Sequence, residues 1–317
     1  MEQLHLFKTE KIPIVVAYGM GVDSTTALIG LARRGIRPDL ILFADTGGEK
    51  RETYDYKPVF QDWLDREGFP TIVTVRYKPV NFKNWPPYHT LEENCLTNGT
   101  LPSLAFGFKS CSLKWKVCPQ DKFVQQWDVA REVWSNGQKV IKVIGYDAGP
   151  TDMRRRNHAG NASDPRYDYQ YPLIEWEWDR ERCKEEIRRA GLKVPCKSAC
   201  FFCPATKPEE IDKFPSDLLR RIIRMEARAQ PRLIKVEGLW RKSTRTRPGS
   251  ITQYIAAKNL LPAEEIVDLL ETTNREIIEF QEGYATALAS GRGSEFLANA
   301  REGEDRRHPA SSPVAHS

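Results

Sequence analysis

The chain has 317 residues, of which 40% are hydrophobic and 29% are charged, and its net charge is +5. This length and composition predict a globular protein with one large α/β domain or two smaller ones, and they exclude a chain too polar to bury a core. No apolar stretch reaches the length that crosses a bilayer, and residues 1–5 lack the layout of a signal peptide, so we expect a cytoplasmic protein.

The first half of the chain alternates between short apolar segments and helix-forming segments. Apolar, β-branched runs predict strands, and amphipathic runs that end at glycine predict the helices between them. Strands separated by helices form parallel sheets through right-handed βαβ units. We therefore expect an α/β fold with a parallel twisted sheet flanked by helices, with strands at 12–17, 40–44, 71–76 and 140–144 and helices at 24–34 and 53–67.

The chain is organised around the segment 15–28, in which an apolar strand runs into two glycines and then into a helix that opens with Asp23 and Ser24. A strand, a glycine loop and a helix start place several backbone N–H groups around one point, where a phosphate binds. The alternative is an ordinary strand-to-helix turn that is capped by Asp23.

Two more polar sites follow apolar strands, at Asp45 and at Asp147. In parallel sheets, ligands bind outside the carboxyl ends of the strands. The sequence therefore predicts that the glycine loop and these two carboxylates meet at one edge of the sheet.

Two long stretches show no clear periodicity. We expect residues 77–110 to form a surface insertion over the active edge, and residues 151–171, which include three consecutive arginines at 154–156, to form an irregular lid or partner surface.

The last third of the chain predicts a helical C-terminal region, with helices at 179–190, 216–230 and 262–288 and with Ser216 as the cap of the second. Between residues 218 and 247 there are ten Lys or Arg against two Asp or Glu. This basic segment predicts either polyanion binding or a solvated helical face.

Composition also suggests the division of the chain. We expect a nucleotide-binding α/β domain at 1–195, a cysteine motif with the basic helical region at 196–289, and a disordered tail at 290–317, where residues are small, charged and include proline.

Three motifs together resemble one superfamily. The glycine loop lacks the ending of a Walker A motif and the third glycine of the dinucleotide fingerprint. It resembles instead the PP-loop of the N-type ATP pyrophosphatases, Ser-Gly-Gly-x-Asp-Ser, whose last four places match residues 21–24 and whose first two differ here. Residues 45–53 resemble the Asp-Thr-Gly-x-x-x-x-Glu-Thr stretch of the phosphoadenosine-phosphosulfate (PAPS) reductase branch. Residues 111–119 resemble its Cys-Cys-x-x-x-Lys-Val-x-Pro stretch, with Ser112 in place of the second cysteine.

The resemblance implies the adenine nucleotide alpha hydrolase-like fold and cleavage of ATP between its α- and β-phosphates, with Mg²⁺. It implies that Ser24 holds the leaving pyrophosphate, that Asp23 orients it or positions Mg²⁺, and that Lys116 neutralises charge at the α-phosphate. The nucleotide contacts that it implies are Tyr18, Gly19, Met20, Gly21, Val22, Asp23, Ser24, Thr25, Asp45, Thr46, Gly47, Gly48 and Arg155.

Seven cysteines in a cytoplasmic chain favour metal binding or catalysis over disulfides. Cys196, Cys200 and Cys203 form a compact set of three thiols, which Cys111 completes to four, with Cys118 as a competing ligand. Relatives in the superfamily use comparable cysteines for a [4Fe–4S] cluster, which we expect here. A structural zinc is the second expectation, and buried thiols without a ligand are the third.

The resemblance leaves the substrate open. A PAPS reductase attacks with a cysteine near its C-terminus, and no cysteine follows Cys203. This favours an enzyme of the kind found in DNA phosphorothioation systems, in which ATP activates an acceptor, DNA or RNA, and a cysteine desulfurase supplies the sulfur. The alternatives are a PAPS or adenylyl sulfate reductase that uses an external thiol, and an inactive nucleotide- or nucleic-acid-binding module.

Overall fold

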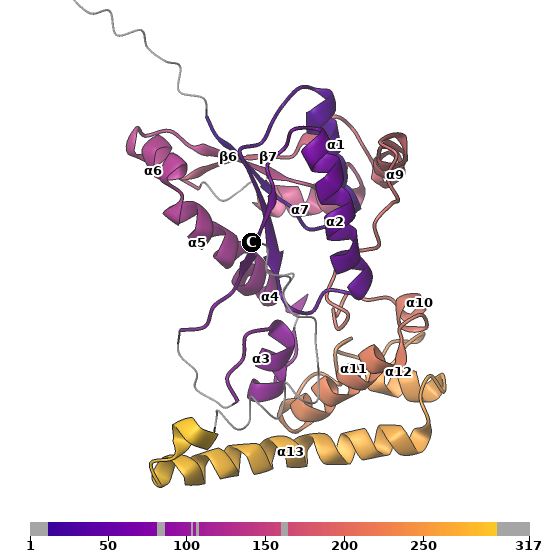
Figure 1. Ribbon diagram of the computed structural model, residues 1–317. Helices are drawn as coiled ribbons and strands as arrows, with labels where there is room; N and C mark the ends of the chain where they lie inside the picture. The colour runs from indigo at the N-terminus through magenta and orange to yellow at the C-terminus, as the bar shows by residue number, and fades with distance from the viewer. Residues whose placement is uncertain (1–11, 81–85, 103, 106–107, 160–163, 297–317) are drawn as a thin grey trace, which may run out of the picture. The chain divides into compact units, whose positions relative to one another are not determined.

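The structure is a computed structural model that describes residues 12–80, 86–102, 104–105, 108–159 and 164–296 (Figure 1). The chain divides into two compact units. The first contains residues 1–78 and 103–206, and the second contains residues 79–102 and 207–317. The cysteine motif thus belongs to the same unit as the glycine loop, whereas we expected it to open a separate region at 196.

The first unit is built on a five-stranded sheet with the order β3-β2-β1-β6-β7, in which every neighbouring pair is parallel. The prediction of an α/β fold with a parallel sheet flanked by helices is therefore confirmed. The strands are β1 (Ile14–Ala17), β2 (Leu40–Asp45), β3 (Ile72–Arg76), β6 (Val140–Ile144) and β7 (Tyr167–Gln170). Four of them begin and end within two residues of the bounds that the apolar runs predict.

Helices cover both faces of this sheet (Figure 1). On one face, α1 (Val22–Arg33), α2 (Arg51–Arg66) and α9 (Arg180–Arg189) share an apolar core with alternate strand residues such as Val16 and Phe43. On the other face, α5 (Cys118–Gln126) and α6 (Asp128–Ser135) pack on the intervening residues. A strand that is buried on both faces reads as a continuous apolar run, which is why β1 and β2 were visible in the sequence.

Shorter elements complete the first unit. A two-residue antiparallel pair precedes a helical turn that passes into a π-helix, and this π-helix carries Lys116. These elements are β4 (Leu104–Ala105), β5 (Phe108–Lys109), α4 (Ser110–Ser112), η1 (Leu113–Val117), α7 (Pro150–Ala159) and α8 (Pro172–Glu175).

Two predictions of irregular structure are wrong within the described residues. The stretch 77–110 contains α3 (Leu91–Asn98), whose start carries a capping box between Thr90 and Glu93. The stretch 151–171 contains most of α7 and all of β7, the fifth strand of the sheet. Tertiary pairing with β6 holds β7 in place despite its polar sequence. Residues 81–85, 103, 106–107 and 160–163 of these stretches lie outside the described residues.

The second unit is helical, which confirms the prediction for the C-terminal region. Helix α11 packs against α3, α12 and α13. Its bounds and those of its neighbours are α10 (Pro208–Ile211), α11 (Ser216–Ala229), η2 (Gln230–Arg232), α12 (Ile251–Ala257) and α13 (Ala263–Ala289). Ser216 does not cap α11 as predicted, because the capping position falls on Pro215 and no side-chain cap forms.

The predicted disordered tail begins at residue 290, and its residues from 297 onward lie outside the described part of the chain. Its described part does not fit the prediction, because residues 293–296 are helical. A search of the described helices for one that is long and apolar enough to cross a membrane finds none.

Candidate nucleotide and metal site

The glycine loop joins β1 to α1 at the carboxyl edge of the sheet. The Ser24 hydroxyl closes the loop from inside, since it accepts a hydrogen bond from the Gly19 amide at 3.1 Å and donates to the Gly21 carbonyl at 3.3 Å. Gly21 occupies the N-cap position of α1 and has no side chain to cap the helix. The first amides of α1 therefore have no side-chain cap, and the anion site at this helix start stays a prediction.

Met20 stands where the PP-loop pattern has a glycine, and its backbone explains that pattern. Its φ is +57°, in the left-handed region that glycine adopts most easily. The Met20 side chain is fully buried in the core, and burial of a flexible thioether offsets part of this strain.

Several predicted contacts of the loop can be made only by the backbone. The side chains of Tyr18, Met20, Val22 and Thr25 are all buried. The Tyr18 ring stacks on Phe60 at a centroid distance of 5.3 Å instead of facing the loop opening. Main-chain amides and the Ser24 hydroxyl thus remain as the groups of the loop that suit a phosphate.

The end of β6 approaches the start of α1 very closely. A Cβ added to Gly145 would lie 2.7 Å from the Ser24 backbone nitrogen and 2.9 Å from the Asp23 carbonyl carbon. Only glycine fits there, and this approach brings the loop after β6 to the glycine loop. The parallel pairing of β1 with β2 and β6 confirms that the three predicted strand ends share one edge.

Three aspartates form a carboxylate cluster at this edge. One oxygen from each of Asp23, Asp147 and Asp152 lies within 4.8 Å of the others. Arg180, the first residue of α9, bridges two of them through contacts of 2.9 Å to Asp23 and 3.1 Å to Asp147. Carboxylate oxygens are the ligands that Mg²⁺ prefers, so the donors fit the ion that the resemblance implies.

The crowding of carboxylates changes the acidity of Asp23. Burial raises the pKa of Asp23 to about 7, with the neighbouring carboxylates of Asp147 and Asp152 adding to the rise and Arg180 opposing it. A divalent cation at the cluster would favour the ionised form and reverse this effect.

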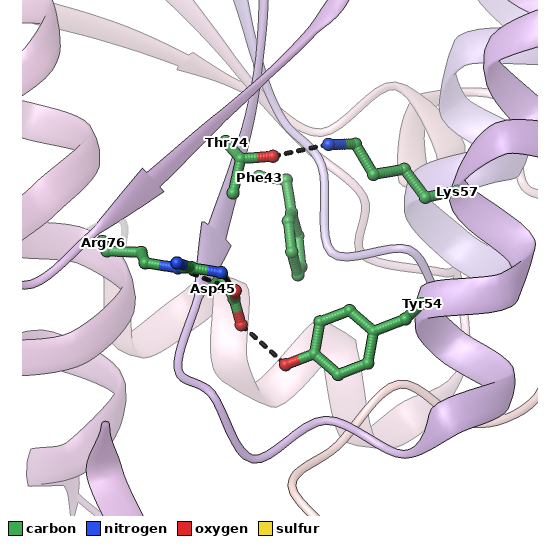
Figure 2. Close-up of a pocket in the computed structure, with 6 residues that line it drawn as sticks. All are labelled: Phe43, Asp45, Tyr54, Lys57, Thr74 and Arg76. Carbon is green, nitrogen blue, oxygen red and sulfur yellow. Dashed lines mark hydrogen bonds and ion pairs between the residues drawn. The ribbon is translucent and has the colours of Figure 1, made fainter. Parts of the chain in front are cut away.

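Asp45 closes β2, and its carboxylate is fully engaged by protein groups (Figure 2). One oxygen accepts from the Gly47 amide at 2.8 Å and from the Tyr54 hydroxyl at 2.7 Å, and the other accepts from the Arg76 guanidinium at 2.6 and 2.9 Å. Burial alone would raise the pKa of Asp45, but these hydrogen bonds hold it below its ordinary value. Its side chain thus positions the loop and Arg76, and its contact with a nucleotide stays a prediction.

The cysteine segment, residues 196–203, lies across both the glycine loop and the loop that follows β2. The Ser198 hydroxyl donates to the Gly19 carbonyl of the glycine loop. The Phe201 amide donates to the Gly48 carbonyl at 2.9 Å, and Cys200 forms a β-bridge with Glu49. Three segments from distant parts of the sequence therefore meet at one edge of the first unit.

The thiols of this segment face polar groups of the β2 loop and of α2. The Cys200 sulfur lies 3.1 Å from the Thr46 hydroxyl, and the Cys196 sulfur lies 3.4 Å from the Thr53 hydroxyl. Thr46, a predicted nucleotide contact, thus faces a thiol. Gly48 leaves room for the segment, because a Cβ there would lie 2.7 Å from the Phe202 ring.

Lys116 reaches this thiol group from the π-helix. Its ammonium lies 2.8 Å from one oxygen of Glu49, whose side chain is fully buried. Burial alone would lower the pKa of Lys116, but Glu49 and the thiols of Cys200 and Cys203 raise it. Burial, reinforced by Glu49 and opposed by Lys116, raises the pKa of the Cys200 thiol to about 12. Lys116 therefore lies beside the cysteine segment, and its role at the α-phosphate stays a prediction.

The arrangement of the thiols bears on the metal that they would hold. All seven cysteines are free of disulfides. Among the described residues, the aspartate cluster is the only group of three or more donors within 4.8 Å of one another, so no three thiols are that close. Tetrahedral zinc with bonds of about 2.3 Å needs its sulfurs roughly 3.8 Å apart, so this spacing does not support zinc. An iron–sulfur core lies between its thiolates and tolerates wider spacing, and the Thr and Lys donors suit thiolate ligands.

Two of the thiols named in the sequence come from elsewhere in the first unit. Cys111 lies in the helical turn before the π-helix, and Cys118 begins α5; both are partly exposed. Nothing in the contacts of the described residues chooses between them as the fourth ligand, and that assignment stays a prediction.

The structure shows residues of the site that sequence patterns did not indicate. Arg180 and Asp152 belong to segments without a motif, and Glu49 occupies a variable place of the Asp-Thr-Gly stretch. Arg155, predicted at the phosphates, is half exposed and donates to Asp152 at 2.7 Å.

Comparisons with known proteins give little beyond this geometry. The chain matches no protein-family model and no curated protein. Among solved structures, the U34-tRNA thiolase NcsA from Methanococcus maripaludis, with its [4Fe-4S] cluster, is similar with a TM-score of 0.37 and 12% sequence identity, over 84% of this chain and 72% of that chain. A likeness at this level carries no argument about function, so the function must be inferred from the site itself.

Proposed function

We propose that the chain is an ATP pyrophosphatase that adenylylates an acceptor, most favourably nucleic acid, so that sulfur can replace the activated oxygen. The observation that carries this proposal is the packing of the cysteine segment on the glycine loop, through Ser198 to Gly19, and on the loop after β2, through Phe201 to Gly48. An anion site and a set of thiols at one sheet edge suit a reaction that couples phosphate chemistry to sulfur chemistry.

The glycine loop supports the first half of this reaction. The loop amides and the start of α1 would hold the leaving pyrophosphate, and the Ser24 hydroxyl would order the loop around it. Asp23, Asp147 and Asp152 would hold Mg²⁺, which supplies charge neutralisation on the phosphates. Arg180 already lies at these carboxylates and would stay near the phosphates when the cation binds.

The cysteine segment supports the second half. Cys196, Cys200 and Cys203, with Cys111 or Cys118, would hold a [4Fe–4S] cluster, which supplies a binding point for the incoming sulfur. Lys116 and the hydroxyls of Thr46 and Thr53 would stabilise the negative charge of the thiolates. A cysteine desulfurase is the sulfur donor that we propose.

DNA, or alternatively RNA, is the acceptor that we propose, as in DNA phosphorothioation. Part of the basic segment at 218–247 is used within the second unit, where Arg220 pairs with Glu265 and Arg221 pairs with Glu92. The other exposed cations there are Arg224, Arg232, Lys235, Lys242 and Arg245. These five charges are the part of the segment that supports binding of a polyanion.

The test is Ser24→Ala, with Ser135→Ala on α6 as the matched control. Incubation with [α-³²P]ATP, nucleic acid and a desulfurase should give AMP and pyrophosphate with the wild type and with the control. We expect at least about 100-fold less product with Ser24→Ala, because the loop loses the hydroxyl that orders it. Unimpaired turnover in Ser24→Ala would place the catalytic centre elsewhere.

The acceptor is tested separately. Mass spectrometry of nucleic acid from cells with and without the protein should reveal sulfur-containing nucleotides only in its presence. An unchanged profile, together with ATP cleavage in vitro, would reject nucleic acid as the acceptor. Release of sulfite from adenylyl sulfate or its 3′-phosphate would favour a reductase instead.

A further inference from the structure

A pocket of about 380 Å³ lies in the first unit, at the sheet edge formed by β3 and against the first turns of α2. Its volume is in the lower range for small-molecule sites. Figure 2 shows its lining, in which the Phe43 ring lies between charged and hydroxyl side chains. The lining residues are Phe43, Asp45, Tyr54, Lys57, Thr74 and Arg76.

One side of the pocket is fixed by Asp45. Because Asp45 and Arg76 are direct partners in the β2–β3 register, the carboxylate lies beside the guanidinium and binds it twice. Tyr54 donates to the same carboxylate from α2. This pattern orients Arg76 and compensates its charge.

The other side of the pocket carries a cation whose charge is not compensated. Lys57 donates to the Thr74 hydroxyl at 2.6 Å, and within the described residues it has no carboxylate in an ion pair. Burial lowers the pKa of Lys57, with Arg76 adding to this effect and Asp45 opposing it. Across the whole lining there are two cations and one anion, so the pocket carries a net positive charge.

We infer that this pocket binds a phosphate or sulfate group, held between the Lys57 ammonium and the Arg76 guanidinium over the Phe43 ring. A tetrahedral oxyanion supplies the missing negative charge and accepts the hydrogen-bond donors that converge here. The Phe43 ring excludes water from one side, which strengthens these contacts. The volume leaves space for a group attached to the phosphate, so an inorganic ion, a nucleotide and a nucleic-acid phosphodiester all carry the required chemistry.

This site is distinct from the glycine loop. None of the residues that line it belongs to that loop or to the aspartate cluster. The pocket therefore gives the first unit a second place for an oxyanion, whatever reaction takes place at the first.

A selenate soak of crystals tests the location of the site. We expect an anomalous selenium peak between Lys57 and Arg76 in the wild type and in Arg66→Ala, an exposed cation at the far end of α2, and no such peak in Lys57→Met. In every crystal, a selenium peak at the glycine loop serves as the control that selenate has entered. Loop peaks without a pocket peak in the wild type would overturn the inference.

Titration calorimetry identifies the source of the oxyanion, with inorganic phosphate, AMP and a short single-stranded oligonucleotide as the three probes. The true class of ligand should bind at least about tenfold more weakly to Lys57→Met, while Lys57→Arg stays within about threefold of the wild type. Thermal unfolding confirms that each variant is folded. Changes below about twofold for all three probes would overturn the inference.

Discussion

Two buried glutamates, one in each unit, show how differently the two regions use a charge. Glu226 of α11 accepts four hydrogen bonds, two on each oxygen, from Leu239, Ser250, Ile251 and Thr252, at 2.6 to 3.0 Å. Glu49 pairs one oxygen with Lys116, and its second oxygen is buried without a hydrogen-bond partner among the described residues.

This difference separates a structural role from a functional one. A carboxylate with every acceptor satisfied stabilises its surroundings, and Glu226 ties α11 to the start of α12, where a negative charge is favourable. An unsatisfied buried oxygen is costly, and such groups gather at sites that bind something. Glu49 lies beside the thiol of Cys200, so the unsatisfied oxygen marks the region that we assign to chemistry.

The largest expected effect comes from replacing Glu226, the glutamate whose oxygens are all hydrogen-bonded. Glu226→Ala leaves four buried donors without an acceptor and opens a cavity, so we expect a loss of about 3 to 5 kcal/mol in the free energy of unfolding. Denaturant titration of the second unit's unfolding measures it. Glu271→Gln, at an exposed site on α13 of the same unit, is the control and should change little. A loss below about 1 kcal/mol in Glu226→Ala would mean that solvent or a rearranged helix replaces its hydrogen bonds.

A smaller effect is expected at Glu49, where the ion pair with Lys116 matters more for stability than either residue alone. Lys116→Ala leaves the fully buried Glu49 without its cation, which should cost about 2 kcal/mol, since the Lys116 side chain is itself one-third exposed. Adding Glu49→Gln removes the stranded charge and should restore stability to within about 1 kcal/mol of the wild type. Chemical denaturation of the four proteins of this double-mutant cycle gives the coupling energy.

Lys114→Ala, an exposed lysine on the same π-helix, is the control for that cycle. The double variant should be folded but defective in the proposed sulfur incorporation, because the thiols lose both neighbours. Additive losses in the cycle would show that Glu49 and Lys116 do not act as a pair.

The sequence predicts those features of the fold and of the site that local residue patterns determine. Continuous apolar runs indicate β1, β2 and β6, because both faces of these strands are buried. Gly21, Asp23 and Ser24 indicate the glycine loop, because only a few residue types are favoured at the start of a helix. The capping box of Thr90 and Glu93 is a local signal for α3 that we missed when we expected an irregular insertion at 77–110.

The remaining features depend on contacts between distant residues. Arg180 reaches Asp23 and Asp147 only because α9 packs on α1, and Arg76 reaches Asp45 only because of the β2–β3 register. A local sequence pattern does not indicate either contact. β7 is polar and pairs on one side only, so its strand character is decided by its partner.

The smallest expected effect concerns Asp23, a third carboxylate, which lies at the functional edge like Glu49. Its pKa is raised to about 7 from an ordinary 3.8, so the folded protein binds a proton between these values that the unfolded chain releases. The associated stability is present in acid and is lost as pH rises through about 7. Between about pH 6.3 and 8 the wild type should therefore lose about 1 kcal/mol relative to Asp23→Asn, which has no such titration. Thermal unfolding across this range measures the difference, with Asp168→Asn on β7 as an exposed control. Millimolar Mg²⁺ should abolish the slope by holding Asp23 ionised with Asp147 and Asp152, and a slope that persists in Mg²⁺ would exclude the aspartate cluster as the cation site.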